Sequence, residues 1–223
     1  MIAARQIAFG KAAAKKEEPP AYWGLCFTAE EAGSTVAMQA VGSAPAVTLE
    51  TSFDGEIWEP FTVGETTITL PNVGDKVYFR AGEGGNTAMA SSANDYNNFS
   101  IITGRIAASG NIMSLLNGDS PDSIIAAHCY PSIFRDCTAL VQAPELPATT
   151  LTGSCYASMF WNCINIDCIK CSFKAFALGG TNNWLRGVSS TGTFICPTAL
   201  GTNETIQRGI SYCPEGWTVI NKD

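Results

Sequence analysis

A phrase built from cysteines and aromatic residues occurs twice in this chain, at a separation of 26 residues. "CYPSIFRDCTAL" begins at Cys129 and "CYASMFWNCINI" begins at Cys155, and the cysteines, the tyrosine, one serine and one phenylalanine fall at matching positions. Internal repeats of 20–50 residues are typical of solenoids, in which each unit buries its apolar face only against its neighbours. The repeat therefore predicts a short solenoid of stacked coils.

Stacking of like units brings like positions together, and this fixes which side chains point inward. The segment between the two cysteines of a unit is expected to be a helix-like turn with Ile133 and Phe134 facing the core, followed by a strand and a return loop in "TALVQAPELP". A degenerate unit, "GRIAASGNIMSLLN", precedes the two clear ones, and in a later unit Trp184-Leu185 replaces Met159-Phe160. We expect three vertical pairs: Cys129 over Cys155, Phe134 over Phe160 and Cys137 over Cys163.

The first half of the chain has a different pattern. From Tyr22 to about Thr103, short alternating apolar runs are separated by turn signals at Asp54-Gly55 and at 72–75. Such runs with Gly-bearing turns are typical of a β-sandwich. The segment 82–98, rich in Gly, Ser and Asn, is predicted to be a long exposed loop.

The first twenty residues form a basic arm in an otherwise acidic chain. The net charge is −7 over 223 residues, whereas residues 1–20 carry +2. "EEPP" ends any helix there, because proline cannot continue one. The arm is either a disordered tail or a docking peptide, and in the second case its basic residues are the assembly anchor: Arg5, Lys11, Lys15 and Lys16.

Composition argues against several classes of protein. The acidic balance and the lack of a basic face predict no nucleic-acid binding. No apolar run approaches the ~20 residues that span a bilayer. The N-terminus lacks the uninterrupted apolar stretch of a secretory signal, so we expect no export by that route. With nine cysteines, an odd number, and four of them tied to the repeat, most are expected to be buried thiols.

Candidate catalytic and metal-binding residues are few. Cys168-Ile-Lys-Cys171, with Cys163 nearby, could be a zinc knuckle or a redox pair, but there is no second Cys-x-x-Cys and the repeat explains Cys163. His128 is the only histidine and is best explained as a turn residue. We therefore predict no metal, no cofactor and no enzymatic activity.

Aromatic side chains are the remaining candidates for ligand contact. Trp58, Tyr96, Trp161, Trp184 and Trp217 are the ones considered, and core packing is expected for Trp184 and Trp217. Trp161 occupies the outward position that Arg135 holds in the preceding unit, which makes it the candidate ligand-contact residue, by stacking on a sugar.

Several segments together resemble one family. "CYPSIFRDCTALVQAPELPATTLTGSCYASMFWNC", "LCFTAEEAGSTVAM", "DKVYFRAG" and "NNWLRGVSSTGTF" resemble the BspA-like leucine-rich-repeat proteins of gut bacteria and their phages and prophages, and "LETSFDGEIWEPF" is similar to the middle strands of fibronectin type III or immunoglobulin-like domains. The resemblance implies an α+β, β-rich chain with three parts: an anchor arm at 1–20, an immunoglobulin- or fibronectin-III-like β-sandwich at 21–103, and a leucine-rich-repeat block with a C-terminal cap at 104–223.

Two functions follow from this resemblance. The first is a non-enzymatic bacteriophage virion protein, a head or tail appendage or fibre, which joins other virion proteins through its arm and binds a host surface glycan or protein. The second is a BspA-like adhesin at the bacterial cell surface. An adhesin is expected to begin with an export signal, whereas a virion protein assembled in the host cytoplasm needs none, and this favours the first. A homo-oligomer is compatible with both.

Overall fold

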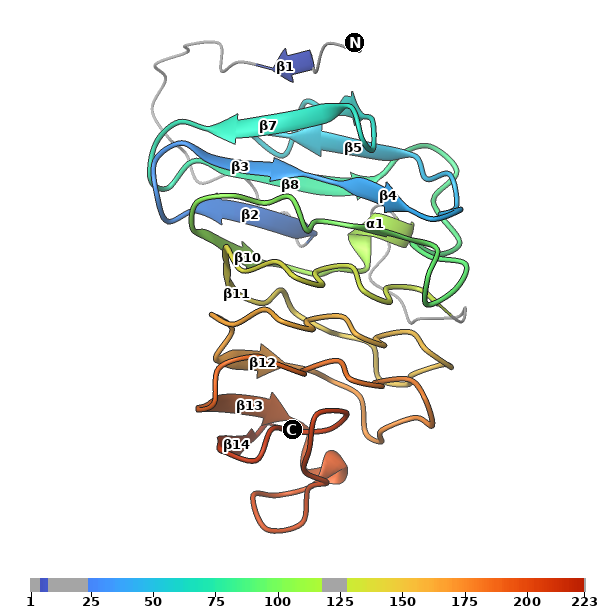
Figure 1. Cartoon of the computed structure of the whole chain (residues 1–223), viewed down its shortest axis with the longest axis vertical. Helices are drawn as coiled ribbons and strands as arrows, with labels where there is room; N and C mark the ends of the chain where they lie inside the picture. The colour runs from blue at the N-terminus through green and yellow to red at the C-terminus, as the bar shows by residue number, and fades with distance from the viewer. Residues whose placement is uncertain (1–4, 8–23, 118–127, 223) are drawn as a thin grey trace.

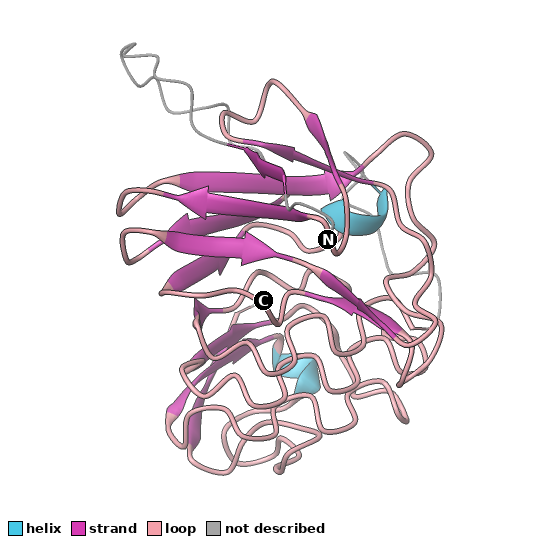
Figure 2. Cartoon of the chain, turned by 45° about the horizontal axis from the view of Figure 1, so that its top comes forward, coloured by secondary structure: helices cyan, strands magenta, loops and turns pink. Residues whose placement is uncertain are grey.

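The computed structural model describes residues 5–7, 24–117 and 128–222, and it confirms a β-rich chain (Figure 1). Within these residues, helical structure is limited to α1 (Ser114–Asn117) and one 3-10 turn, η1 (Thr198–Leu200). The strands form sheets in the first half of the chain, and mostly turn-built coils follow in the second half (Figure 2).

Two sheets enclose the core of the first half. A six-stranded sheet has the order β11-β10-β2-β8-β5-β6, and a three-stranded sheet has the order β1-β7-β3. Strands β4 and β9 form a separate pair. The bounds are β1 (Arg5–Ile7), β2 (Leu25–Ala29), β3 (Ser34–Ala37), β4 (Gln39–Val41), β5 (Leu49–Ser52), β6 (Glu59–Phe61), β7 (Thr66–Leu70), β8 (Lys76–Ala81), β9 (Tyr96–Asn98), β10 (Ile106–Ser109) and β11 (Leu140–Gln142).

The predicted turns are present, and they have different roles. Strands β5 and β6 form an antiparallel hairpin around Asp54, whose Oδ1 accepts hydrogen bonds from the backbone N–H groups of Glu56 and Ile57. These bonds stabilise the charged carboxylate and lower the pKa of Asp54. The turn at 72–75 instead carries the chain from β7 in one sheet to β8 in the other.

The segment 82–98 is only partly the exposed loop that its composition predicted: Glu83, Gly84, Thr87 and Asn94 are exposed, whereas other residues pack inward. Met89 and Ala90 are buried, and residues 96–98 form β9, which pairs with β4. The segment lies against the first coil, where Met89 N–H donates to the carbonyl of Cys129 at 2.8 Å. Phe99 N–H likewise donates to the carbonyl of Ile133 at 2.8 Å. Backbone pairing with residues far along the chain therefore buries part of a segment that has little apolar character of its own.

The two repeats stack with the predicted register. The N–H groups of Tyr130 and Phe134 donate to the carbonyls of Cys155 and Met159 in the next coil, at 2.9 and 3.0 Å. The N–H groups of the odd-numbered residues Ile133 and Arg135 bond back three positions within their own turn, to Tyr130 at 3.4 Å and to Ser132 at 3.0 Å. Successive backbone N–H groups thus bond alternately to the next coil and to their own turn, so they are hydrogen-bonded without forming a helix.

Left-handed residues replace the helix-like turn that the sequence predicted. Every fourth residue in each coil has a φ between 53° and 77°, which bends the chain and prevents a continuous helix. These residues form three vertical rows in successive coils: His128, Ser154 and Gly179; Ser132, Ser158 and Asn183; Asp136, Asn162 and Gly187. The rows also show that the spacing is 26 residues between the first two coils and 25 to the third.

An aromatic column runs through the core from the first half of the chain into the repeats. Adjacent rings have centroids 5.1 to 5.6 Å apart along the series Phe61, Phe79, Phe99, Phe134 and Phe160. The sheet is continuous as well, because β10 pairs with β2 on one side and with β11 on the other. One hydrophobic core therefore extends across residue 104.

The last coils end in a parallel sheet of three strands, β12 (Cys168–Lys170), β13 (Gly192–Cys196) and β14 (Trp217–Asn221). Ile169 and Phe194 are fully buried, and Trp184 packs edge-on against Phe194 with ring centroids 6.0 Å apart. Burial of Trp184 and Trp217 confirms the core packing expected for both.

Candidate functional site: a ladder of arginine and tryptophan

One outward position recurs in three successive coils and carries Arg135, Trp161 and Arg186. The backbone places them one above another: Asp136 N–H donates to the carbonyl of Trp161 at 2.8 Å, and Asn162 N–H donates to that of Arg186 at 2.7 Å. We call these three residues the Arg–Trp ladder. The sequence identified its first two members; Arg186 was missed because the third coil is one residue shorter.

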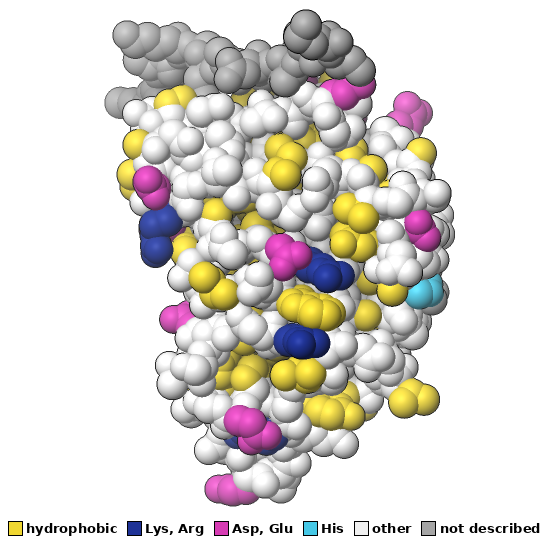
Figure 3. Space-filling view, viewed as in Figure 1, with side chains coloured by type: hydrophobic (Ala, Val, Ile, Leu, Met, Phe, Trp, Pro, Cys, Tyr) yellow, Lys and Arg dark blue, Asp and Glu magenta, His cyan; other side chains and the backbone are white. Residues whose placement is uncertain are grey.

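The tryptophan ring lies between two guanidinium groups. The Cζ atom of Arg135 is 4.5 Å from the ring centroid of Trp161, and that of Arg186 is 4.6 Å from it. Because the arginines come from the coils on either side, they cover opposite faces of the ring. Basic and hydrophobic side chains alternate at the centre of the face shown in Figure 3. Each contact is a cation–π interaction, worth about 0.5–1 kcal/mol at an exposed site.

The neighbouring polar groups distinguish the two arginines. Arg135 Nε lies 3.4 Å from Asp136 Oδ2, and Asp136 Oδ1 accepts a hydrogen bond from Asn162 Nδ2 at 3.1 Å. Arg186 is exposed, and no carboxylate of the described chain lies within ion-pairing distance of it. Arg186 is therefore a guanidinium with donors available to a ligand.

This geometry changes the contact that Trp161 can make. A sugar stacks on the face of an aromatic ring, and both faces of Trp161 are covered by arginine side chains. Trp161 instead aligns the two guanidiniums, which recognise planar anionic groups such as carboxylates through paired N–H donors. The ladder fits an acidic ligand better than a neutral sugar.

The other predicted site residues lie elsewhere. Arg5 belongs to β1, which pairs with β7 at the rim of the three-stranded sheet. Lys11, Lys15 and Lys16 lie outside the described residues. Trp58 is half-buried beneath Arg80, whose Cζ is 4.1 Å from the ring centroid, and Tyr96 is buried.

The side chains of Cys168 and Cys171 do not point toward a common site. Burial alternates along it: Cys168 is half-buried, Ile169 is buried, Lys170 is exposed and Cys171 is buried. Side chains three positions apart in an extended chain point to opposite faces, so the two sulfurs cannot bind one ion together. Among the described residues, no three side chains of His, Cys, Asp or Glu gather as a metal site would require.

The nine cysteines are thiols in the structure, and eight of them are buried. Cys137 and Cys163, which occupy equivalent positions of the two repeats, make equivalent hydrogen bonds. Cys137 Sγ donates to the carbonyl of Phe99 at 3.4 Å, and Cys163 Sγ donates to that of Phe134 at 2.9 Å. Burial disfavours the thiolate and raises the pKa of Cys137 to about 12. Thiols in such surroundings are poor nucleophiles.

His128 lies in a turn with a φ of 58°, as its sequence position suggested. Its backbone N–H donates to the carbonyl of Gly153 at 3.3 Å, and its Nδ1 has no hydrogen-bond partner among the described residues. No carboxylate among the described residues therefore holds its Nδ1 in the orientation that a general base needs.

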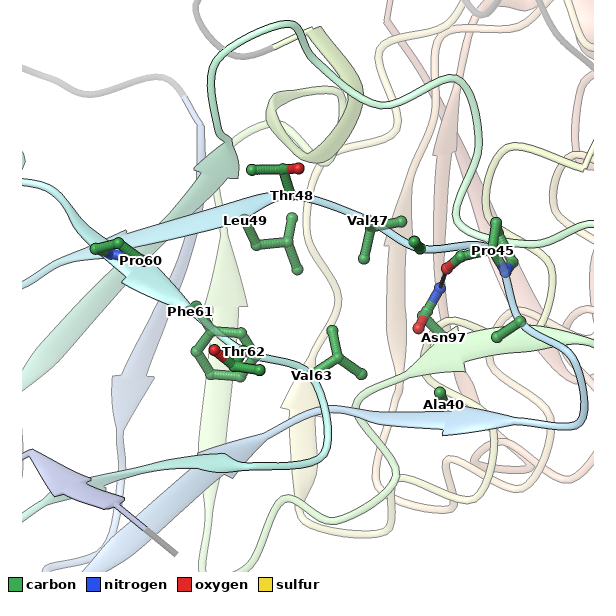
Figure 4. A pocket seen from close by; sticks show the side chains of 12 residues that line it. Ala40, Pro45, Val47, Thr48, Leu49, Pro60, Phe61, Thr62, Val63 and Asn97 are labelled. Atoms are coloured by element: carbon green, nitrogen blue, oxygen red, sulfur yellow. Dashed lines mark hydrogen bonds between the residues drawn. The ribbon is translucent and has the colours of Figure 1, made fainter.

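A pocket of about 450 Å³ lies between β4, β5, β6 and β9 (Figure 4). Its walls are mainly Ala, Pro, Val and Leu side chains. The amide of Asn97 points into the wall, where its Nδ2 donates to the carbonyls of Pro45 and Met89 at 3.0 and 3.1 Å. The pocket is thus lined by apolar side chains, the bonded amide of Asn97 and two threonines, and none of its lining side chains is a carboxylate, histidine, lysine or cysteine.

Comparison with known proteins gives no match: no family model, no curated protein and no solved structure is similar to this chain at a significant level. In the part of the chain that the structure describes, no helix combines the length and hydrophobicity needed to cross a bilayer.

Proposed function

We propose that this chain is a non-enzymatic bacteriophage virion protein, a head or tail appendage that displays a repeat block on the particle surface. In finer detail, a β-sandwich carries a short BspA-like leucine-rich-repeat solenoid, and the basic arm attaches the molecule to other virion proteins. The observation that supports this proposal most directly is the hydrogen-bonded stack of coils with a row of outward side chains, because such a stack suits display and recognition.

The ligand is expected to be an acidic host glycan or an acidic protein segment bound at the Arg–Trp ladder. Two guanidiniums on opposite faces of one ring lie about two strand spacings apart, roughly 9–10 Å. A polymer with repeated carboxylates or sulfates can reach both. Nucleic acid is a weaker candidate, because the chain carries −7 overall.

The arm supplies the test of attachment. Lys11, Lys15 and Lys16 are replaced together by Glu, which leaves residues 5–7 and β1 intact. A matched control replaces three exposed lysines of the body, Lys76, Lys174 and Lys222, with the same change in total charge.

The arm variant is expected to be absent from purified particles, whereas the body variant copurifies with them. Thermal unfolding of both should resemble that of the unmodified chain. Normal incorporation of the arm variant would show that attachment uses another surface. A protein found at the bacterial surface and never with particles would support the BspA-like adhesin instead.

A further inference from the structure

The sheets of this molecule end in edge strands that differ in how they are protected. Edge strands present unpaired backbone groups and can add a strand from another chain. At the outer end of the six-stranded sheet, β6 contains Pro60, which has no N–H donor, and Glu59, which is exposed. Proline and charge are the usual means of preventing strand addition.

The edge of β14, at the other end of the molecule, is covered by side chains. Arg208 Nη1 donates to the carbonyl of Trp217 at 2.7 Å, and the N–H of Val219 donates to Asn203 Oδ1 at 3.1 Å. Two backbone groups along this edge are therefore already bonded within the chain, so the edge is partly covered.

Strand β7 has neither kind of protection. Its sequence, "TTITL", contains no proline and no charge, and its residues alternate between buried and half-buried. One side pairs with β3 and the other is taken by β1, through the parallel pairs Arg5↔Thr66, Gln6↔Thr67 and Ile7↔Ile68. In Figure 1, β1 lies alone at the N-terminal end of the molecule, along β7. The edge of β7 is thus an acceptor, and residues 5–7 are a strand that fits it.

The connection between this strand and the rest of the chain is long. Sixteen residues, 8–23, separate β1 from Gly24, the first described residue of the body. A fully extended connection of that length can span up to about 50 Å, roughly the length of several strands. The pairing therefore does not by itself require both strands to belong to one chain.

We propose that β7 accepts residues 5–7 of a second copy of this chain, so that neighbouring copies are joined by exchanged N-terminal strands. Exchange keeps the same three backbone pairs and requires no new surface, which makes it a low-cost route to oligomers. The arm is basic and the rest of the chain is acidic, so each arm is attracted to the body of its neighbour. This proposal does not depend on the virion assignment, because it concerns only contacts between copies.

Disulfide trapping tests whose strand occupies the edge. Gln6→Cys is made in one tagged chain and Thr67→Cys in another, and the two are co-expressed, purified and oxidised with mild diamide. Thr67 is half-buried and is the register partner of Gln6. Gln6→Cys combined with Thr69→Cys, which has no partner in β1, controls for register. The unmodified chain controls for the native thiols.

Strand exchange predicts a covalent heterodimer from the two single variants, which reductant reverses and the register control lacks. It also predicts that a chain carrying both substitutions forms covalent multimers, and that deleting residues 1–7 gives a monomer in light scattering. The proposal is overturned if the double variant stays a single chain while losing two thiols and the mixed variants do not link, because β1 then pairs with its own β7. It is equally overturned if no variant forms a link.

Discussion

Phe134 and Phe160 lie one above the other in the core, with ring centroids 5.5 Å apart and ring planes 5° from parallel. They occupy equivalent positions of successive coils, and both are fully buried. This pair joins the first clear repeat to the second and continues the column that begins at Phe61. The 26-residue separation of these two residues in the sequence is the reason that they contact each other in successive coils.

Truncating either ring should strongly destabilise the protein. Phe134→Ala and Phe160→Ala are each expected to lower the free energy of unfolding by about 3–5 kcal/mol, as large-to-small changes in a core do. The double variant should lose about 0.5–1.5 kcal/mol less than the sum, because the stacking contact is lost only once. Urea denaturation measures all three. Arg135→Ala is the control, and it should lower the free energy of unfolding by at most about 1 kcal/mol. A larger decrease for Arg135→Ala than for Phe134→Ala would mean that the inward and outward positions are reversed.

The Arg–Trp ladder should affect binding more than stability. Arg186→Ala and Arg186→Glu should weaken binding to acidic glycans on an array, the second more strongly, while each changes the free energy of unfolding by about 1 kcal/mol or less. Arg186→Lys keeps the charge but not the paired donors, so intermediate binding is expected. Ile164→Ala, at an exposed position outside the ladder, is the control. Unchanged binding by Arg186→Glu would exclude the ladder as the ligand site.

The left-handed conformation of the three rows can be tested by replacing glycines with Ala at positions with and without a positive φ. Gly179 has a φ of +74° with open space around its α-carbon, and Gly187 has a φ of +77°, where an added Cβ would lie 3.4 Å from the Cα of Asn162. Replacement by Ala should destabilise at both positions by about 1–2 kcal/mol through backbone strain, because the 3.4 Å contact at Gly187 is an ordinary van der Waals distance. Gly153→Ala is the control, since that residue has neither positive φ nor close neighbours, and it should be neutral or slightly stabilising. Equal effects at Gly153 and Gly179 would contradict the left-handed assignment.

Two tyrosines in successive coils differ in how their buried hydroxyls are bonded. Tyr156 Oη has no hydrogen-bond partner among the described residues, whereas Tyr130, in the coil before it, directs its hydroxyl to Met113 Sδ at 3.5 Å. Removing an unsatisfied hydroxyl removes its desolvation cost, so Tyr156→Phe should raise the free energy of unfolding by about 1 kcal/mol. Tyr130→Phe should have a smaller effect. Thermal melts of the two variants compare them, and destabilisation by Tyr156→Phe would reveal a hydrogen bond at that site.

The buried thiols should make the protein sensitive to alkaline pH. The pKa of Cys137 is raised from an ordinary 9.0 to about 12, and burial raises the pKa of Cys196 to about 11. Well below pH 9 these thiols are protonated in both the folded and the unfolded chain. As the pH rises above 9, the unfolded chain releases protons that the folded chain retains, and stability falls by up to about 1.4 kcal/mol per pH unit for each such thiol.

Denaturation at about pH 8, 9 and 10 measures this slope. Cys137→Ser keeps a donor near the carbonyl of Phe99 but does not titrate, so its slope should be smaller than that of the unmodified chain, even though it is less stable at about pH 8. An identical slope for both would show that Cys137 ionises normally. In the folded protein, the half-buried Cys168 should be the first thiol to react with a disulfide reagent.

The sequence alone determined the period of the repeat and which side chains face inward. Phe134, Phe160 and the paired cysteines could be placed because each coil packs against a near copy of itself, so spacing within one unit predicts contacts between units. The β-rich character and the hairpin at Asp54 also followed from local patterns. The tertiary structure decided what depends on residues distant in the chain: the packing of part of 82–98 against the first coil, the separation of β7 and β8 into different sheets, and the pairing of β1 with β7. It also decided the character of the candidate site, because the faces of Trp161 are covered only when coils of 26 and 25 residues bring Arg135 and Arg186 to either side of it.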